Sequence, residues 1–507
     1  MPIENAADYL LDRHLHEDRA NNVALRYENG MVTYRDLVLS SSGLAAVFAE
    51  VTIRASDRVL LVLPDGPLFV SCLFGIWRIG ALAIPVSINL AENDFVMIIK
   101  DCEPVAAIVF DDLIPTFEKI RSQLSGIRYL QASELNQVDV NCGHTSAVSC
   151  GWNAPALIQY TSGTTGHPKG VVHVHAALTR VVKGFPPRLN LSETDLCYSL
   201  AKMSFGYGFG NSILFPFAVG ASSLLDASPP HPSRVFRLLR SHCPTILFAV
   251  PSLYAALLDF ADQDAEAALA GVRHCISAGE RLAQSISQKW KNRFGHELID
   301  GLGATEALHI FLSATPGMIR SGSIGTPVAG CDVELRTEDG KLAPIGEAGV
   351  LHVRSNFNST GYWRQGSVSR SSDDWIATND LLRSEEDGFY YFIGRTDDLI
   401  KIAGLKVAPG EIEERLQEHE SVGECRVVGA ENGDGVMSLM AFVVLRKGWN
   451  PDKSHERCLR EFSSATLAPH KRLRRIVFLA AMPKTTTGKI DRSALRNTAA
   501  ALLNRQQ

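Results

Sequence analysis

In the first part of the chain, short apolar runs alternate with segments of helical periodicity. The runs at 58–63 and 81–86 have the length of buried strands, and residues 68–79 between them have the spacing of a helix. The runs at 106–110 and 245–249 continue the pattern. Strands that alternate with helices indicate parallel βαβ units. The sequence therefore predicts an α/β fold with mixed and parallel sheets flanked by helices.

The pattern changes after a short polar junction at 396–398. Beyond it we expect one charged helix and two strands, at 409–419, 424–429 and 438–445. This mixture is typical of a small α+β unit, and its length of about 110 residues is usual for a domain. We therefore expect a large N-terminal domain over 1–396 and a small mobile domain over 397–507.

The composition disfavours several classes of function. The 507 residues carry a net charge of −5, so we expect no nucleic-acid partner, which would need a concentrated basic face. The ten cysteines include no Cys-x-x-Cys pair, which favours reduced core thiols over a zinc ribbon or disulfide framework.

No membrane association or export is expected either. The chain does not start with a basic segment followed by an apolar one, as a signal peptide would. The uncharged stretch 203–225 is long enough to span a bilayer, but its four glycines, asparagine and proline favour a globular core segment. We therefore expect a cytoplasmic protein.

Two histidines, close together in the sequence, are possible metal ligands. His173 and His175 alternate on an expected strand and would share one face. Because no third ligand is evident, we interpret them as packing or surface histidines.

The most informative motif is Thr161-Ser162-Gly163-Thr164-Thr165-Gly166-His167-Pro168-Lys169-Gly170, which follows an expected strand at 156–160. Its glycines let the backbone turn and expose N–H groups, while four hydroxyls and a lysine add donors, as a polyphosphate requires. The motif is not a Walker A loop, in which the lysine directly follows a glycine. An ordinary turn would explain the glycines but not the hydroxyls and lysine together.

Three further motifs are weaker when each is taken alone. Thr305 and Glu306, within 300–309, suit a helix N-terminus that holds an anion and a magnesium-bound oxygen, although such a pair is more often a cap. Asp380 is a candidate acceptor for ribose hydroxyls. Lys489 lies in a threonine-rich loop and is a candidate to reach a phosphate from a second domain.

Together, in this order and at these separations, the motifs resemble those of the adenylate-forming superfamily. That superfamily includes acyl-CoA synthetases, the adenylation domains of peptide synthetases and firefly luciferase. The resemblance covers the chain from about Tyr27 to Ala494. It implies that the protein uses ATP and Mg²⁺ to activate a carboxylic acid as an acyl-adenylate, and then hands the acyl group to a thiol.

The resemblance also implies a role for each motif. Thr305 is expected at the α-phosphate, Glu306 on Mg²⁺, and Lys489 as the lysine that assists adenylation. Asp397 matches the hinge, and Gly404 matches the segment that lines the pantetheine tunnel. The nucleotide-binding residues implied are Thr161, Ser162, Gly163, Thr164, Thr165 and Lys169 for the β- and γ-phosphates, Ser277, Ala278, Gly279, Glu280, Asp300, Gly301 and Leu302 for adenine, and Asp380 and Arg395 for ribose.

One position departs from the family pattern. The family usually has Thr-Gly-Asp where this chain has Thr378-Asn379-Asp380. Asparagine is the non-glycine residue that best tolerates a positive φ, so we expect the turn to be preserved.

Two segments, 201–211 and 303–311, resemble the benzoate and anthranilate CoA ligase branch. In that branch, aromatic side chains form the walls of a flat pocket that suits a planar ring. Gly206 and Ala304 favour the anthranilate type, because benzoate ligases tend to have alanine and serine there. We therefore expect 2-aminobenzoate or another small substituted benzoate. The acid-binding residues implied are Phe205, Gly206, Tyr207, Gly303, Ala304 and His309.

Two acceptors fit the same first half-reaction. We expect CoA as the cosubstrate, with the protein as a monomer or homodimer. The alternative is a stand-alone aryl-acid adenylating enzyme that loads a carrier protein in trans, since the sequence has no Gly-Gly-x-Ser carrier site before Gln507. The aryl pocket disfavours a luciferase-like oxygenase, and a non-catalytic acid-binding protein would need neither Lys489 nor a second domain.

Overall fold

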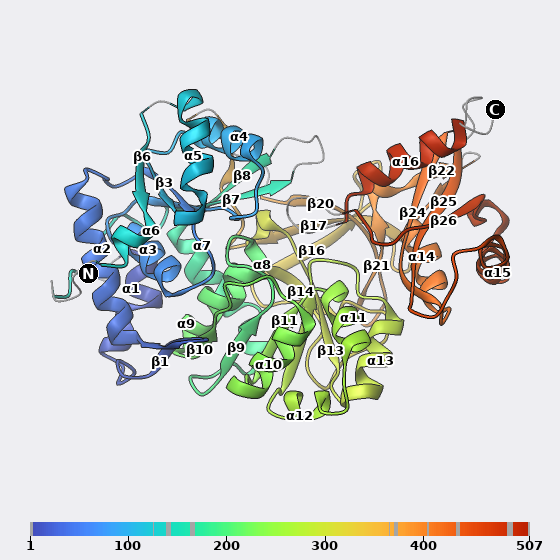
Figure 1. Ribbon diagram of the computed structural model, residues 1–507, viewed down its shortest axis with the longest axis horizontal. Coiled ribbons are helices and arrows are strands. Elements are labelled where there is room, and N and C mark those ends of the chain that lie inside the picture. The colour runs from blue at the N-terminus through green and yellow to red at the C-terminus, as the bar shows by residue number, and fades with distance from the viewer. Residues whose placement is uncertain are drawn as a thin grey trace.

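The computed structural model describes residues 4–124, 126–137, 143–162, 168–364, 366–369, 374–402, 405–431, 437–483 and 490–504. The chain begins in the part at the left of Figure 1 and ends in a smaller unit at the right. Large mixed sheets with helices packed on them make up the N-terminal part, as the alternating pattern predicts.

The first large sheet is parallel from β7 to β6 and antiparallel where β7 meets β8 and β8 meets β18. In β3, Val59 and Leu61 enter one core while Leu60 and Val62 enter another on the opposite face. Burial on both faces explains the continuous apolar run in the sequence. In spatial order, the strands are β19 (Ser367–Ser369), β18 (Gly361–Arg364), β8 (Pro168–Val174), β7 (Pro155–Ser162), β4 (Leu82–Pro85), β3 (Arg58–Val62), β5 (Ala106–Val109) and β6 (Arg128–Gln131).

The second large sheet is parallel from β13 to β1, with antiparallel strands at its two edges. Its central strand β11 has the same two-sided burial, because Ile246 and Phe248 face one core and Leu247 faces the other. In spatial order, the strands are β15 (Thr326–Pro327), β14 (Ile310–Ser313), β13 (Leu298–Gly303), β12 (His274–Ala278), β11 (Ile246–Ala249), β9 (Leu196–Ser199), β10 (Ser222–Leu224), β1 (Val23–Tyr27) and β2 (Gly30–Thr33).

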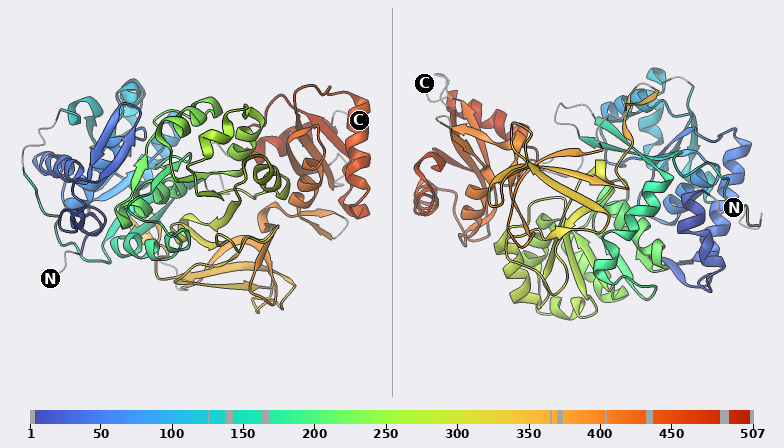
Figure 2. Two further views of the ribbon diagram at one scale, coloured as in Figure 1. Left: turned by 90° about the horizontal axis from the view of Figure 1, so that it is seen from below. Right: turned by 180° about the vertical axis from the view of Figure 1, so that it is seen from behind.

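A third, antiparallel sheet projects from the large part, as the left view of Figure 2 shows in yellow and orange. It brings the candidate ribose-binding strands together. Its strands are β16 (Cys331–Arg336), β17 (Ala348–Ser355), β20 (Ile376–Ser384) and β21 (Tyr390–Arg395).

The C-terminal unit has its own cores on the two faces of one small sheet. Helices α14 and α15 pack on one face, through residues such as Ile412 and Leu459, and α16 packs on the other through Leu495. Its strands and helices are β22 (Ile400–Ile402), β23 (Leu405–Val407), α14 (Pro409–Gln417), β24 (Val422–Glu431), β25 (Met437–Leu445), α15 (Lys453–Ser464), β26 (Arg475–Phe478) and α16 (Arg492–Asn504). The boundary at 396/397 and the mobility of this unit stay predictions.

Helices of the large part cover its sheets. The longest, α2, begins at a capping box in which the side chains of Thr33 and Asp36 each accept a hydrogen bond from the other residue's backbone N–H. The helices are α1 (Ala6–Leu10), α2 (Tyr34–Glu50), α3 (Pro67–Arg78), α4 (Glu92–Cys102), α5 (Ile114–Ile120), α6 (Ala132–Leu135), α7 (His175–Arg180), α8 (Gly206–Phe209), α9 (Phe215–Val219), α10 (Pro232–His242), α11 (Pro251–Phe260), α12 (Ala265–Leu269) and α13 (Gln284–Phe294).

The uncharged stretch 203–225 is folded into the core rather than into one long helix. It contains α8, a π-helical turn at Gly210–Leu214, α9 and β10. Within the described residues, no helix is long and apolar enough to cross a membrane.

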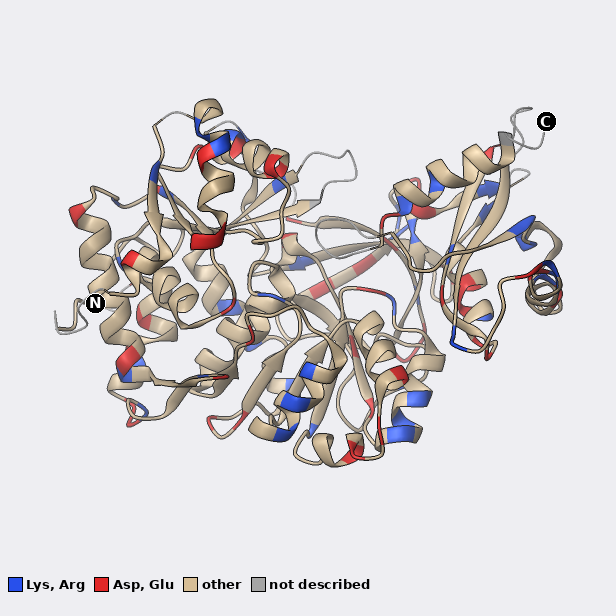
Figure 3. Ribbon diagram, viewed as in Figure 1, with Lys and Arg blue, Asp and Glu red and all other residues tan. Residues whose placement is uncertain are grey.

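Charged residues of both signs are spread along the ribbon in Figure 3. The arginines of α10 form ion pairs with acidic residues elsewhere in the chain. Arg234 and Arg237 contact Glu28, and Arg240 contacts Asp262.

Two expectations about individual residues need correction. His173 lies in β8, but His175 is the first residue of α7, so the two histidines do not share a strand face. His175 Nδ1 accepts a hydrogen bond from the backbone N–H of Ala6 at 3.1 Å, which ties α7 to α1. The cysteines are not all in the core, because Cys243 and Cys458 are exposed free thiols.

The N-terminal residues are held by a buried ion pair. The Arg78 guanidinium, at the end of α3, contacts the Asp12 carboxylate with both terminal nitrogens, and its Nε donates to Ser41 Oγ at 2.9 Å. The side chains of Arg78 and Asp12 are 1% and 5% exposed. Removing one partner of such a pair leaves the other charge buried and unpaired.

Asp12→Ala should therefore lower the free energy of unfolding by about 3–5 kcal/mol. The exposed pair Arg121–Glu118 serves as a matched control, for which Glu118→Ala should cost about 1 kcal/mol or less. Urea unfolding of the three proteins compares the two pairs. Equal losses would contradict the view that the Arg78–Asp12 pair anchors the N-terminus.

Candidate active site

The phosphate motif forms a β-hairpin between β7 and β8. Thr161 pairs with Lys169 across the antiparallel ladder, so both ends of the motif lie side by side on two neighbouring interior strands of the first large sheet. The Lys169 Nζ lies 5.8 Å from the centroid of the Tyr362 ring. Residues 163–167 of the motif lie outside the described residues.

Tyr362 connects this hairpin to the expected magnesium ligand. Its hydroxyl donates a hydrogen bond of 2.8 Å to Glu306 Oε1, and it lies on β18, which pairs with β8. Burial and the Glu306 carboxylate raise the pKa of Tyr362 well above its usual value, so its hydroxyl stays a donor. Lys169 and Glu306 are therefore brought to the same ring from two sheets.

The sequence suggested that Thr305 and Glu306 begin an α-helix, but they do not. They form a single 3₁₀ turn, Thr305–Ala307, preceded by Ala304 as its N-cap residue. The next residue, Leu308, has a φ of 61°, which is uncommon for a bulky side chain and costs energy. This reversal directs the chain from Glu306 to His309 within one tight turn.

The expected adenine segments lie side by side. In the parallel pairing of β12 and β13, Ser277 is opposite Asp300 and Ala278 is opposite Gly301. Gly279 then turns with a φ of +88°, a conformation that favours glycine. Burial raises the pKa of the Asp300 carboxyl to about 8.

Glu280, the last residue of the first adenine segment, is already engaged. Its carboxylate accepts hydrogen bonds from the backbone and hydroxyl of Ser252, both at 3.2 Å. These bonds fix the loop to the start of α11. Leu302 follows Gly301 in β13 and packs beside the core between the second and third sheets.

The expected ribose-binding residues meet on β20 and β21. Asp380 pairs with Arg395 across the ladder, and their side chains are 3.5 Å apart. Asn379, within β20, has a φ of 62°, so it adopts the positive φ expected at the position where the family has glycine. Burial raises the pKa of Asp380 to about 6, so its carboxylate is mostly ionised at neutral pH.

Asp397 lies in a short 3₁₀ turn, Thr396–Asp398, between β21 and β22. Its carboxylate accepts from Arg395 Nε at 3.0 Å, so the junction is tied to a ribose-binding candidate. The large part and the C-terminal unit are also joined by an ion pair. Arg281, which follows Glu280, pairs with Glu414 of α14 at 2.7 Å.

Five predicted site residues, and one side chain, cannot be placed. Nothing is described for the side chain of Ser162, although its backbone belongs to β7. The residues outside the described ranges are Gly163, Thr164, Thr165, Gly404 and Lys489.

The predicted acid-binding segments contact one another directly. His309 Nε2–H donates to the Tyr207 backbone carbonyl at 3.2 Å, and the two rings are 5.6 Å apart. Burial lowers the pKa of His309 to about 3, so the ring is neutral at physiological pH. With the proton on Nε2, Nδ1 is a bare acceptor, and it has no hydrogen-bond partner among the described residues.

Aromatic side chains surround His309. Phe215 and Phe185 have ring centroids 4.4 and 6.4 Å from it. A Cβ on Gly210, in the π-helical turn, would lie 2.2 Å from the His309 ring, so the glycine makes this approach possible. π-Turns are frequent at functional sites.

Other predicted acid-binding residues take part in the same arrangement. Phe205 is the partly exposed N-cap residue of α8. Gly303 ends β13, and a Cβ on it would lie 2.7 Å from the His309 carbonyl oxygen. Ala304 lies between this close contact and the 3₁₀ turn.

A residue that sequence reasoning missed lies beside Gly206. A Cβ on Gly206 would be 3.1 Å from Gln159 Oε1. Gln159 is 1% exposed, and neither polar atom of its amide has a partner in the part of the chain that the structure describes. A buried unpaired amide costs about 1–3 kcal/mol. The sequence feature that could have identified this residue is a glutamine within the mainly apolar strand expected at 156–160.

The Glu306 carboxylate suits Mg²⁺ held jointly by the protein and by substrate phosphates, rather than a metal ion held by protein side chains alone. Among the described residues, no group of three or more His, Cys, Asp or Glu side chains is placed to hold a metal ion. Mg²⁺ prefers oxygen ligands and is commonly held by one or two carboxylates together with substrate phosphates. Glu306, oriented by Tyr362, suits that arrangement.

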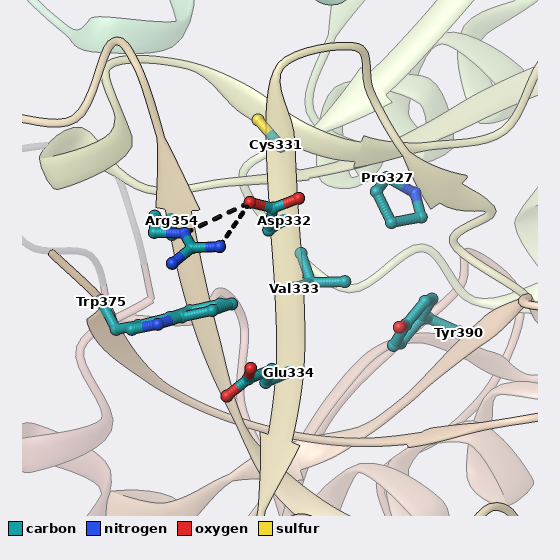
Figure 4. A pocket seen from close by; sticks show the side chains of 8 residues that line it. All are labelled: Pro327, Cys331, Asp332, Val333, Glu334, Arg354, Trp375 and Tyr390. Carbon is teal, nitrogen blue, oxygen red and sulfur yellow. Dashed lines mark hydrogen bonds and ion pairs between the residues drawn. The ribbon is translucent and has the colours of Figure 1, made fainter.

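A surface hollow of about 410 Å³ on the third sheet is separate from these residues. Figure 4 shows the Asp332–Arg354 ion pair, 3.0 Å long, at its wall. None of the predicted nucleotide- or acid-binding residues lines it. The lining residues are Pro327, Cys331, Asp332, Val333, Glu334, Arg354, Trp375 and Tyr390.

Comparisons with known proteins find relatives that match almost the whole chain. The chain is 34% identical to the benzoate–CoA ligase of Thauera aromatica over 505 residues, covering 97% of this chain and 96% of that protein. It is 33% identical to the 4-hydroxybenzoate–CoA/benzoate–CoA ligase of Rhodopseudomonas palustris over 513 residues, covering 98% and 95%.

A solved structure of the anthranilate CoA ligase AuaEII in complex with anthranoyl-AMP superimposes with a TM-score of 0.91. It is 32% identical, and the match covers 99% of this chain and 98% of that one.

Two family models match the chain. The model of the AMP-binding enzyme covers residues 11–363, and the model of the AMP-binding enzyme C-terminal domain covers residues 411–489. The protein is therefore an enzyme of the AMP-binding family, with the adenylate-forming fold that its motifs predict.

Proposed function

We propose that this enzyme is an AMP-forming aryl-CoA ligase. It activates a benzoate-type acid, 2-aminobenzoate or another small substituted benzoate, as the acyl-adenylate, and transfers the acyl group to CoA. The curated relatives compared above are named as CoA ligases of aromatic acids. A carrier-protein thiol is the competing acceptor.

The turn from Thr305 to His309 is the observation that carries the proposal. At one end, Glu306 is joined through Tyr362 to the phosphate hairpin. At the other end, His309 forms a hydrogen bond with the Tyr207 backbone carbonyl in the segment 201–211, called the aromatic segment. A nucleotide on one side and an aromatic acid on the other would thus meet at this turn.

The chemistry requires two anions to approach each other. Lys169 would offset the charge of the β- and γ-phosphates, and Lys489 would stabilise the charge that develops at the α-phosphate. Glu306 would hold Mg²⁺, which when bound neutralises phosphate oxygens and orients the pyrophosphate leaving group. Tyr362 keeps the Glu306 carboxylate in one orientation before ATP binds.

The acid site would bind its substrate by shape and neutral polar contacts. The carboxylate displaces pyrophosphate from ATP, and the thiol then attacks the acyl carbonyl with loss of AMP. No step needs a covalent intermediate on the protein. His309 is neutral because burial lowers its pKa to about 3, so it would act as a hydrogen-bonding wall rather than as a cation.

Lys489→Ala should impair adenylation far more than thioester formation from supplied acyl-AMP. Loss of a charge-assisted contact to a transition state commonly costs on the order of 10²–10³ in rate. Both half-reactions can be measured separately, with Lys484→Ala, at the lysine five residues earlier in the sequence, as the control. Equal losses of rate in the two half-reactions would contradict the assignment of Lys489 to adenylation alone.

Asp397→Pro should have the opposite effect, because proline fixes φ and would block rotation at the junction. Acyl-AMP should form and remain on the enzyme, while CoA-dependent turnover falls. Asp397→Ala is the matched control, since it removes the contact with Arg395 but leaves the backbone free to rotate. Normal turnover of the proline variant with CoA would exclude Asp397 as the hinge.

Substrate choice tests the aryl assignment. In ATP–pyrophosphate exchange across a panel of acids, 2-aminobenzoate or a similar substituted benzoate should be used at least as well as benzoate, and octanoate poorly. Gly206→Ala should penalise the substituted acid more, since a methylene-sized change in a pocket is worth ~1–3 kcal/mol. The added methyl would also press on Gln159 Oε1, 3.1 Å away.

Two results would overturn parts of this proposal. An unchanged ratio of kcat/KM values in Gly206→Ala would show that this position does not sense the substituent. Preference for octanoate over every aryl acid would refute the aryl assignment while leaving adenylation intact.

A further inference from the structure

The side chain of Gln159 is buried and polar, and its contacts within the protein do not explain why a polar group is there. It lies near the middle of β7, between Ile158, which is fully buried, and Tyr160. Its backbone pairs with Val171 of β8, so the strand ladder is satisfied without the side chain. Within the described ranges, both its Oε1 and Nε2 lack a hydrogen-bond partner.

The amide points at the segment expected to bind the acid. The position that a side chain on Gly206 would occupy is 3.1 Å from Gln159 Oε1 and 3.5 Å from the Leu308 carbonyl oxygen. Gly206 opens α8, and Leu308 ends the turn that leads to His309. Because residue 206 has no side chain, Gln159 Oε1 lies directly beside the backbone of Gly206, where the Leu308 carbonyl oxygen is also close.

A second unpaired group lies in the same two segments. His309 is bonded through Nε2 to the Tyr207 carbonyl, and its Nδ1 acceptor has no partner among the residues described. Buried polar atoms are normally paired, so a ligand that supplies partners is a physical reason for such a pair of groups.

We propose that Gln159 is a specificity-determining residue, through which the enzyme recognises a hydrogen-bonding substituent, amino or hydroxyl, on the ring of its aromatic acid. This inference rests on the proposed function, because it requires an aromatic acid in the site. An amide offers one acceptor and two donor hydrogens. It can accept from an amino or hydroxyl group and donate to a hydroxyl, whereas a methyl group of similar size satisfies neither atom.

The physical consequence is discrimination against substituents that cannot form hydrogen bonds. A site built to hydrogen-bond a substrate group rejects the analogue that lacks it, because the buried protein group is then left unpaired. A purely structural glutamine would act differently: its replacement would lower the use of all acids by a similar factor.

The wild-type enzyme provides the first test, which requires no variant to fold. ATP–pyrophosphate exchange is measured with 2-aminobenzoate against 2-methylbenzoate and with 4-hydroxybenzoate against 4-methylbenzoate. At least one amino or hydroxyl acid should exceed its methyl counterpart in kcat/KM by about tenfold or more. Equal use within both pairs would overturn the inference and leave the aryl-ligase proposal standing.

Gln159→Leu provides the second test. The ratio of kcat/KM for the favoured acid to that for its methyl counterpart should fall at least about tenfold. Gln131→Leu, on the exposed end of β6 in the same sheet, is the matched control and should leave the ratio unchanged. An unchanged ratio in Gln159→Leu would assign the residue to structure alone. If the wild-type enzyme activates only aliphatic acids, the proposed function fails and this inference fails with it.

Discussion

The site depends on the reversal of the chain at Leu308. A φ of 61° at a bulky residue is energetically costly, and such strain persists only where the surrounding structure enforces it. Here the enforcement comes from both ends of the turn. Glu306 is held by Tyr362, and the His309 ring is held by the Tyr207 carbonyl and by neighbouring aromatic rings. The turn thus places Glu306, the proposed magnesium ligand, and His309, the proposed wall of the acid site, three residues apart in the sequence.

The surrounding sheets hold those two ends in place. The first large sheet contains the hairpin proposed to bind phosphate and, through β18, the tyrosine that contacts Glu306. The second large sheet contains the segments proposed to bind adenine, and its strand β13 leads directly into the turn. The aromatic segment reaches the turn only because Gly210 lets the His309 ring approach its backbone.

Local patterns in the sequence predicted much of this and missed what depends on long-range pairing. The continuous apolar runs predicted strands correctly because parallel strands are buried on both faces. Asn379 was expected to keep the conformation of the family's glycine, because asparagine tolerates a positive φ, and its φ is positive. Tyr362 could not be predicted, since its contact with Glu306 arises from the pairing of β18 with β8. The π-turn and the strained Leu308 are likewise set by packing against distant segments.

The most direct test of the account is to identify the products that form from ATP, Mg²⁺ and 2-aminobenzoate, first without and then with CoA. Mass spectrometry should detect the aryl-adenylate in the first reaction, and AMP with the aryl-CoA thioester in the second. Formation of the adenylate without thioester, when a phosphopantetheinyl carrier protein accepts the acyl group instead, would contradict the CoA ligase assignment. Absence of any aryl-adenylate with 2-aminobenzoate and with the other benzoates would contradict the central claim that the turn at Leu308 joins an ATP site to an aromatic-acid site.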